Sequence, residues 1–247
     1  MATRNINAPR LFVEADLAAG ASLACGAEQS HYLSHVVRKQ AGDDILIFNG
    51  RDGEWRAEVV SVRRRSVTLA VCERTRPQVE GPDLHYLFAP LKRARLDYMV
   101  QKATELGVAA LHPVITRRTQ ADRVNLKRMR ANVVEAAEQC GILRIPAVLE
   151  PEKLDTVLAV WQSERRLIFC DEAATGADPV AALNALTPGP LAVLIGPEGG
   201  FDREEREQLL ANPSVTAISL GPRVMRADTA AVAALALVNA VLGDWQS

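Results

Sequence analysis

Two short apolar runs near the C-terminus, each followed by a Gly-Pro turn, place the strongest constraint on how this chain folds. Residues 191–195 run into Gly-Pro-Glu-Gly-Gly at 196–200, and residues 217–220 run into Gly-Pro at 221–222. An apolar segment at 230–242 comes next. We interpret the runs as buried strands of an open α/β sheet. Ligands bind at the carboxyl ends of such strands, where glycine permits close approach to the backbone.

The rest of the chain after residue 83 has the same rhythm of short apolar strands and amphipathic helices. This alternation predicts a parallel α/β sheet. Asp202 and Glu205 are spaced to form a capping box at the start of the helix that follows the first glycine-rich loop. The expected strands are 84–91, 109–115, 145–149, 167–170, 191–195 and 215–220, and the expected helices are 96–106, 124–140, 154–161, 179–186, 203–210 and 229–242.

The first 73 residues follow a different pattern and predict a small β-barrel. Period-2 alternation and a glycine-rich turn at 49–53 favour a meander of strands. The expected strands are 10–13, 44–48, 55–62 and 66–72, with one helix at 28–38. Two prolines and a glycine make 74–82 a predicted linker. The predicted domains are therefore 1–73 and 83–247.

Composition excludes several classes of protein. Hydrophobic residues make up 48% and charged residues 24% of the 247-residue chain, as in globular proteins. No apolar run approaches the roughly 20 residues of a membrane span, and residues 1–10 lack a signal core, so we expect a cytoplasmic protein. The four cysteines are scattered, and His31 and His35 lack a third ligand. We therefore expect no metal site.

Positive charge is concentrated between residues 88 and 130. This segment holds ten Lys and Arg against three acidic residues, a net charge of +7 in a chain whose total is −1. Such a block is typical of phosphate contacts in nucleic-acid-binding proteins. A solvated helix face is the alternative interpretation.

The glycine-rich loops lack the usual nucleotide-binding signatures, both the P-loop lysine and the G-x-G-x-x-G turn. Together with three further segments they resemble the ribosomal RNA small subunit methyltransferase E family, of the SPOUT class of RNA methyltransferases. The segments lie in the family's order along the chain, at 31–38, 101–107, 135–141, 196–201 and 220–229. The family usually has Arg-Thr-Glu-Thr where this chain has Arg226-Ala227-Asp228-Thr229.

The resemblance implies a fold, a reaction and partners. It implies a trefoil-knotted parallel-sheet domain that binds S-adenosylmethionine, and an N-terminal PUA-like barrel that binds RNA. The implied protein is a homodimer that methylates N3 of a uridine in 16S rRNA, within the small ribosomal subunit. Threaded chains are rare, so periodicity alone could not have predicted the knot.

The same resemblance assigns candidate residues to the cofactor and to RNA. Backbone groups of the two loops could bind an adenine and an amino acid beside apolar walls. The cofactor candidates are Leu194, Ile195, Gly196, Pro197, Glu198, Gly199, Gly200, Leu220, Gly221, Met225, Arg226, Thr229 and Ala230. The RNA-binding candidates are Arg38, Lys92, Arg95, Lys102, Arg117 and Arg118. Tight turns with no ligand are the alternative for the two loops.

Methylation at N3 requires loss of a proton from a neutral uracil. Arg226 is the first candidate to hold a uracil oxygen or a phosphate, because its guanidinium fork suits either group. Asp228 is the candidate to accept the proton or to orient Arg226, and a helix N-cap is its alternative role. Glu198 and Glu105 are weaker candidates for the same tasks.

Three other functions remain open at this level. One is an enzyme of the same fold that methylates a ribose 2′-oxygen or another RNA. A second is a non-catalytic RNA-binding or ribosome-assembly factor, which the Ala227-Asp228 pair slightly favours. The third is an α/β enzyme with a small-molecule substrate, against which the basic block counts.

Overall fold

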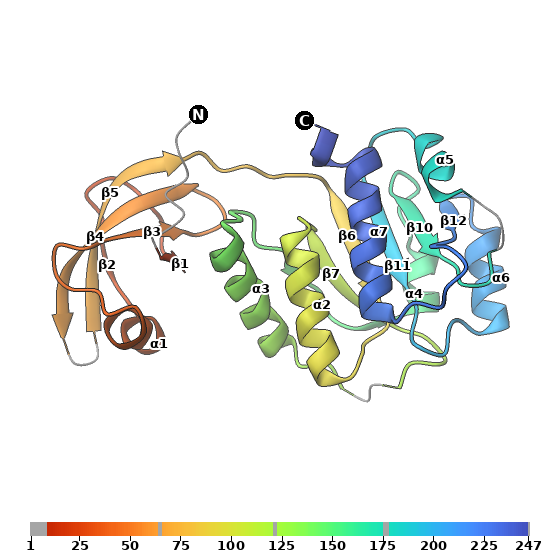
Figure 1. The fold of residues 1–247 in the computed structure, drawn as a ribbon, viewed down its shortest axis with the longest axis horizontal. Coiled ribbons are helices and arrows are strands. Elements are labelled where there is room, and N and C mark those ends of the chain that lie inside the picture. Colours follow the sequence, from red (N-terminus) through yellow and green to blue (C-terminus); the bar gives the residue numbers. More distant parts are fainter. Residues whose placement is uncertain (1–8, 64–65, 121–122, 175–177, 247) are drawn as a thin grey trace. The chain divides into compact units, whose positions relative to one another are not determined.

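The computed structural model describes residues 9–63, 66–120, 123–174 and 178–246, which form two compact units (Figure 1). The first unit contains the described residues up to Glu80 together with Ala137–Ile145. The second contains the described residues from Gly81 to Ala136 and from Pro146 onward.

The first unit is built on a five-stranded sheet with strand order β1-β3-β4-β5-β2. Its strands are β1 (Arg10–Phe12), β2 (Ser22–Ala24), β3 (Asp44–Phe48), β4 (Glu54–Arg63) and β5 (Ser66–Arg76). β1 pairs with β3 in parallel, and the other pairs are antiparallel. Alternating apolar residues of β3, β4 and β5 form its core, as the period-2 pattern predicts. The β-rich N-terminal module is thus confirmed, although β5 continues to Arg76, into the predicted linker.

The helix expected at 28–38 has two parts. An α-helix, α1 (Ala27–His31), continues as a π-helical turn, Tyr32–Val36. The chain then leaves the turn through Arg38, which has a positive φ of 54°. Apolar spacing cannot distinguish the two helix types, because both bury Leu33 against the sheet.

Ala137–Ile145 packs on the first unit, although it follows the sequence of the second. The segment comprises the end of α3 (Leu126–Cys140) and the loop after it. Ala137 and Leu143 form a small core with Phe48. Glu138 accepts a hydrogen bond from the backbone N–H of Phe12 at 2.8 Å. A single boundary in the sequence therefore does not separate the two units, because Ala137–Ile145 belongs to the first.

A buried carboxylate on β4 joins several parts of the first unit. Glu54 accepts hydrogen bonds from Arg76 at 2.7 and 2.8 Å and from Arg10 at 3.1 Å. Arg76 also donates to the carbonyl of Gly141 at 3.0 Å. Burial raises the pKa of Glu54, but hydrogen bonds and charges from Arg76, with those of Arg10 and Thr75, outweigh it and hold the pKa below its ordinary value.

The second unit is a parallel sheet with strand order β12-β10-β11-β6-β7-β8, and β9 pairs with β7. Every pair is parallel, which confirms the predicted α/β class. The strands are β6 (Leu84–Phe88), β7 (Ala110–Ile115), β8 (Ala147–Val148), β9 (Glu152–Lys153), β10 (Arg166–Cys170), β11 (Leu191–Ile195) and β12 (Val215–Ile218).

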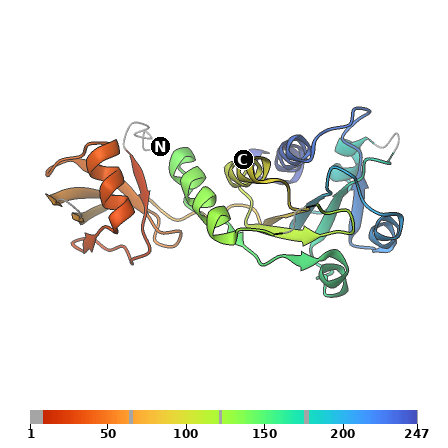
Figure 2. The ribbon, with the colours of Figure 1, turned by 90° about the horizontal axis from the view of Figure 1, so that it is seen from below.

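Helices cover both faces of this sheet, as Figure 2 shows. α2 (Arg93–Glu105) and α7 (Ala227–Leu242) lie side by side on one face, where Tyr86 and Met99 are buried. α4 (Leu154–Ala159) and α6 (Arg203–Ala211) share a core on the other face with alternate residues of the strands, among them Leu87, Phe169 and Leu194. α5 (Pro179–Asn184) packs beside α7. In the described part of the chain, no helix is long and apolar enough to span a membrane.

Candidate functional site

A cavity of about 850 Å³ lies in the second unit, at the carboxyl ends of β10, β11 and β12. Its wall consists of the loops that follow these three strands and the first turns of α7. Parallel neighbours bring their carboxyl ends to one edge of the sheet, so the two loops predicted from the sequence converge there. Ligand pockets have volumes of about 300–1,000 Å³, and this cavity falls within that range.

A positive φ at one position and a close ring contact at another favour glycine in the loop after β11. Gly200 has a φ of +66°, and a side chain there would overlap the Glu172 carboxylate. A Cβ on Gly196 would lie 2.5 Å from Cε2 of Phe201. The Phe201 ring is held in turn by an edge contact with Phe169, with ring centroids 5.0 Å apart. The loop then enters α6 through the predicted capping box: Asp202 accepts from Glu204 N–H at 3.0 Å and Glu205 from Asp202 N–H at 3.0 Å.

The loop after β12 and the start of α7 supply the more open wall. Ser219, Leu220, Gly221 and Met225 line the cavity there, together with Ala230 of α7. Gly221 has a φ of +101°, a backbone conformation that favours glycine. Arg223 and Val224 also line the cavity, and 95% of Val224 is exposed.

A third loop, after β10, completes the wall and carries three of the four carboxylates among its described lining residues. Asp171 is paired with Arg206 of α6 by hydrogen bonds of 2.8 to 3.1 Å, and 3% of its side chain is exposed. Glu172 follows it and is exposed. Burial raises the pKa of the Cys170 thiol to about 12, so this cysteine is a neutral part of the wall.

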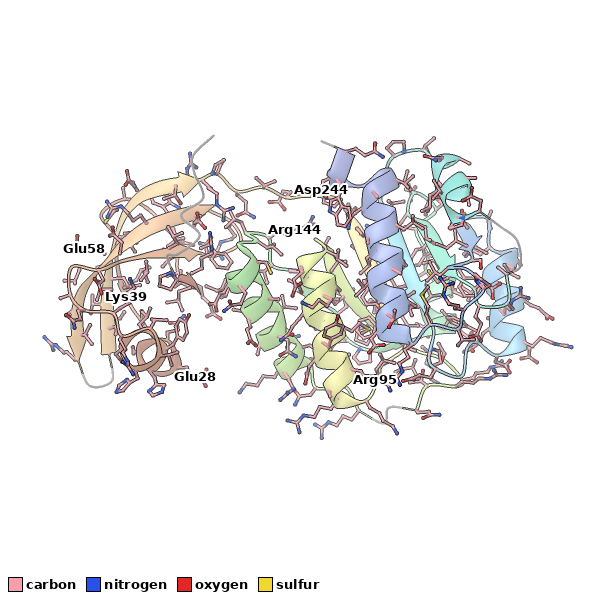
Figure 3. All side chains as sticks on the ribbon, in the orientation of Figure 1. Glu28, Lys39, Glu58, Arg95, Arg144 and Asp244 are labelled. Atoms are coloured by element: carbon pink, nitrogen blue, oxygen red, sulfur yellow. The ribbon has the colours of Figure 1, made fainter. Side chains whose placement is uncertain are left out.

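Two arginines predicted to bind RNA contact the glycine-rich loop after β11, and a third contacts the start of α6, which follows that loop. Arg95, labelled in Figure 3, lies 2.9 Å from Glu198. Arg118 donates to the carbonyl of Gly199 at 2.7 Å. Arg117 pairs with Asp202 at 2.9 Å, and its pKa is raised chiefly by a hydrogen bond to Glu204. These arginines of the basic segment 88–130 therefore hold the loop and the start of α6 in place, and they also put positive charge beside the cavity.

Nine of the thirteen predicted cofactor residues line the cavity: Ile195, Gly196, Pro197, Glu198, Gly200, Leu220, Gly221, Met225 and Ala230. The other four lie outside its lining. Leu194 is fully buried in the sheet core, and Gly199 is held by Arg118. Arg226 and Thr229 are exposed at the start of α7.

The two candidates for catalysis lie next to this wall. Arg226 is the N-cap residue of α7, and its guanidinium has no hydrogen bond or ion pair with another described residue. Asp228 is half-buried in the first turn and accepts a hydrogen bond from the backbone N–H of Thr229 at 3.0 Å. The alternative role of Asp228 as the N-cap is wrong, because the helix begins two residues earlier than expected. Burial raises the pKa of Tyr86 well above its ordinary value, and the charge of Asp228 adds to this effect.

The remaining sequence candidates lie on the surface. Lys92 is the exposed N-cap residue of α2. Lys102 pairs with Glu105 at 2.7 Å, which occupies both groups with each other. Arg38 belongs to the first unit, where it is exposed after the π-helical turn.

Sequence reasoning missed the loop after β10 and the residues that it brings to the cavity, Asp171, Glu172 and Asp178, as well as Phe201 and Arg206. Strand 167–170 was predicted, but its place between β11 and β12 was not. An acidic pair directly after a buried strand was the available signal, since strand ends in such sheets gather at one edge.

Comparison with protein families assigns both parts of the chain. Residues 79–239 match the model of an RNA methyltransferase domain. Residues 25–72 match the model of an RNA methyltransferase PUA domain. The two matches agree with the two architectures described above.

Similar sequences cover nearly the whole chain. Ribosomal RNA small subunit methyltransferase E of Synechocystis sp. is 30% identical over 98% of this chain and 78% of its own length. The protein of the same name from Rickettsia conorii is 28% identical over 93% of this chain and 94% of its own length.

Similar solved structures carry a bound cofactor. Ribosomal RNA small subunit methyltransferase E from Neisseria gonorrhoeae, bound to S-adenosylmethionine, matches with a TM-score of 0.87 at 25% identity, over 97% of this chain and all of the other. A putative methyltransferase from Legionella pneumophila, in complex with the same cofactor, matches with a TM-score of 0.86 at 29% identity, over 96% and 99% of the two chains.

Proposed function

This chain belongs to the ribosomal RNA small subunit methyltransferase E family, and from that membership we propose that it methylates N3 of a uridine in 16S rRNA with S-adenosylmethionine. The observation that carries the proposal is the cavity that the two glycine-rich loops build together with the loop after β10. It lies in a fold whose solved relatives bind this cofactor.

The cavity suits the chemistry of the cofactor. Ile195, Leu220, Met225 and Ala230 offer apolar surface for an adenine, and the glycine-rich turns expose backbone groups for its polar edge. Among the residues that the structure describes, four carboxylates and two guanidiniums line the wall, which gives it a net charge of −2. S-adenosylmethionine carries two positive groups and one carboxylate, so the charges of wall and ligand are complementary.

The main task of the protein is to hold the methyl group of the cofactor and the acceptor atom in position. When bound, the cofactor supplies a methyl group activated by the neighbouring sulfonium. In-line transfer then depends on the distance and direction between acceptor and methyl, which protein residues fix before reaction. Gly196 and Gly200 define the inner loop, while Met225 and Ala230 bound the opposite wall.

Arg226 and Asp228 are the residues that we assign to the uracil. The guanidinium of Arg226, which pairs with no other described residue, would hold a uracil oxygen and so stabilise the anion that forms as N3 loses its proton. Asp228 is the carboxylate assigned to accept that proton or to orient Arg226. Its half-buried position in the first turn of α7 supports this role.

RNA would approach the second unit over the surface that carries Lys92, Arg95, Arg117 and Arg118, with Lys102 as a further contact. The first four belong to α2 and to the segment after β7, next to the loop that lines the cavity. Arg38 is the RNA contact that we assign to the first unit by itself. Phosphate contacts by such residues supply affinity without reading sequence. We assign the RNA-binding role of the first unit to its PUA-domain match.

The family also supports a knotted cofactor site, a homodimer and a cytoplasmic reaction on the small ribosomal subunit. Chain threading and dimerisation were implied by the sequence resemblance, and both stay predictions. A dimer would be measured by light scattering at several protein concentrations.

The test is transfer of labelled methyl groups from S-adenosylmethionine to small subunits from a strain that lacks the gene, with naked 16S rRNA beside them. N3 methylation blocks the Watson–Crick edge, so reverse transcription should stop next to one uridine. Label without a stop would instead indicate a 2′-oxygen or another silent position. No label on either substrate would refute the proposed reaction.

Arg226→Ala should abolish transfer while binding of the cofactor, measured by calorimetry, stays largely intact. Arg203→Ala is the matched control, because this arginine of α6 is 87% exposed and pairs only with Glu207 among the described residues. Near-normal turnover by Arg226→Ala would remove Arg226 from the mechanism.

A further inference from the structure

The loop after β10 brings to the cavity a carboxylate with no assigned task. Four carboxylates line the cavity: Asp171, Glu172, Asp178 and Glu198. Asp171 is bound by Arg206, and Glu198 by Arg95. Asp178 caps α5, accepting from the N–H groups of residues 180 and 181.

Glu172 differs from the other three. Its carboxylate has no hydrogen bond or ion pair with another described residue. It lies directly against Gly200, the inner turn of the glycine-rich loop, where any side chain at position 200 would overlap it. The absence of a Cβ at Gly200 therefore lets a carboxylate of one loop stand over the backbone of the other. That arrangement places in the wall, between the β10 and β11 loops, a negative charge that no described residue pairs with.

An unpaired carboxylate beside a ligand cavity selects for a cationic group in the ligand. On the proposed function, the ligand has two, an α-ammonium and a sulfonium. An ammonium has three N–H donors and forms charge-assisted hydrogen bonds with carboxylates, whereas a sulfonium has no N–H to donate. We infer that Glu172 binds the α-ammonium group of S-adenosylmethionine and so fixes the amino-acid end of the cofactor.

Arg223 is placed to bind the α-carboxylate at the same amino-acid end of the cofactor. It lines the cavity from the loop after β12 and makes no ion pair with a described residue. The α-carboxylate of the cofactor would then lie nearer the β12 loop and the ammonium nearer the β10 loop. The remaining apolar wall, from Ile195 to Ala230, is left for the adenosine.

Three ligands and one conservative substitution test this assignment by calorimetry. Glu172→Gln keeps the size of the side chain and removes its charge. S-adenosylmethionine has both cations, S-adenosylhomocysteine has only the ammonium, and 5′-methylthioadenosine has neither. Affinity for the first two should fall about tenfold, as for a partly exposed charge-assisted hydrogen bond, while affinity for methylthioadenosine stays within about twofold. Glu164→Gln, at an exposed glutamate outside the cavity lining, is the control.

Each other outcome overturns the inference in a recognisable way. Unchanged affinity for all three ligands would remove Glu172 from the site. Equal loss for all three would make Glu172 a support of the loop. Loss for S-adenosylmethionine alone would assign Glu172 to the sulfonium. If the wild-type protein bound none of the three, the proposed function itself would fail, and this is distinct from a failure confined to the variant.

Discussion

Gly196→Ala tests whether the inner loop of the cavity is as tightly packed as the structure indicates. The new methyl would lie 2.5 Å from Cε2, 3.0 Å from Cδ2 and 3.1 Å from Cζ of Phe201, so the ring must move. It cannot move freely, because its edge contacts the fully buried ring of Phe169. Overpacking of this kind costs about 1–3 kcal/mol. The ring lines the cavity, so its displacement should weaken cofactor binding as well.

The assays are thermal unfolding and calorimetric titration with S-adenosylmethionine. The melting temperature should fall by about 2–4 °C for each kcal/mol lost. Gly189→Ala is the matched control, because a Cβ there meets nothing within 4 Å. Both substitutions reduce the entropy of the unfolded chain in the same way, so their difference isolates the steric effect in the folded state.

A double variant decides whether the clash with Phe201 is the cause. Phe201→Leu removes the ring atoms that the methyl would meet, so Gly196→Ala should cost much less in that background. If the two effects simply add, or if Gly196→Ala is as stable as Gly189→Ala, the packing argument is refuted.

Two further predictions concern charged groups. Glu54→Gln should lower the free energy of unfolding of the first unit by about 3–5 kcal/mol, because it leaves Arg10 buried beside a neutral group. The control is Glu58→Gln, at an exposed residue of the same strand that Figure 3 labels, and it should change that free energy by under about 0.5 kcal/mol. Because the pKa of Glu54 is lowered by folding, its ionised carboxylate stabilises the protein above the ordinary glutamate pKa of about 4.3. This stability is lost as the pH falls through the pKa of the folded protein. Unfolding curves of the wild-type protein should therefore show a loss of stability in acid that Glu54→Gln lacks. Arg118→Ala should weaken cofactor binding about two- to tenfold, because it removes the hydrogen bond that holds the Gly199 carbonyl. Arg203→Ala, the control, should bind the cofactor as the wild-type protein does. Equal affinities of the two variants would show that this hydrogen bond does not support the cofactor site.

The strands and helices of the second unit were largely predictable because their apolar spacing is regular. β11 matches its prediction, and β10 and α6 differ from theirs by one residue. β2 and β9, strands of three and two residues, were missed. The π-helical turn was missed because its buried residue falls where an α-helix would also bury one.

The candidate site was predictable only in the parts that lie next to each other in sequence. Glycines after two buried strands identified two of the three loops that line the cavity. The braces from Arg95, Arg117 and Arg118 span 81 to 103 residues of sequence, and no local pattern encodes such pairs. The same limit applies to Ala137–Ile145, which packs on a unit far from it along the chain.

The sequence by itself determined the class of fold, the β-rich first part and the two glycine-rich loops, because hydrophobic period and glycine placement are local properties of the chain. Only the tertiary structure decided that β10 lies between β11 and β12, and hence that Asp171 and Glu172 belong to the cavity. Strand order depends on which buried faces pack together across long separations. The charge of the site is therefore a property of the folded sheet, although the residues that carry it are plain in the sequence.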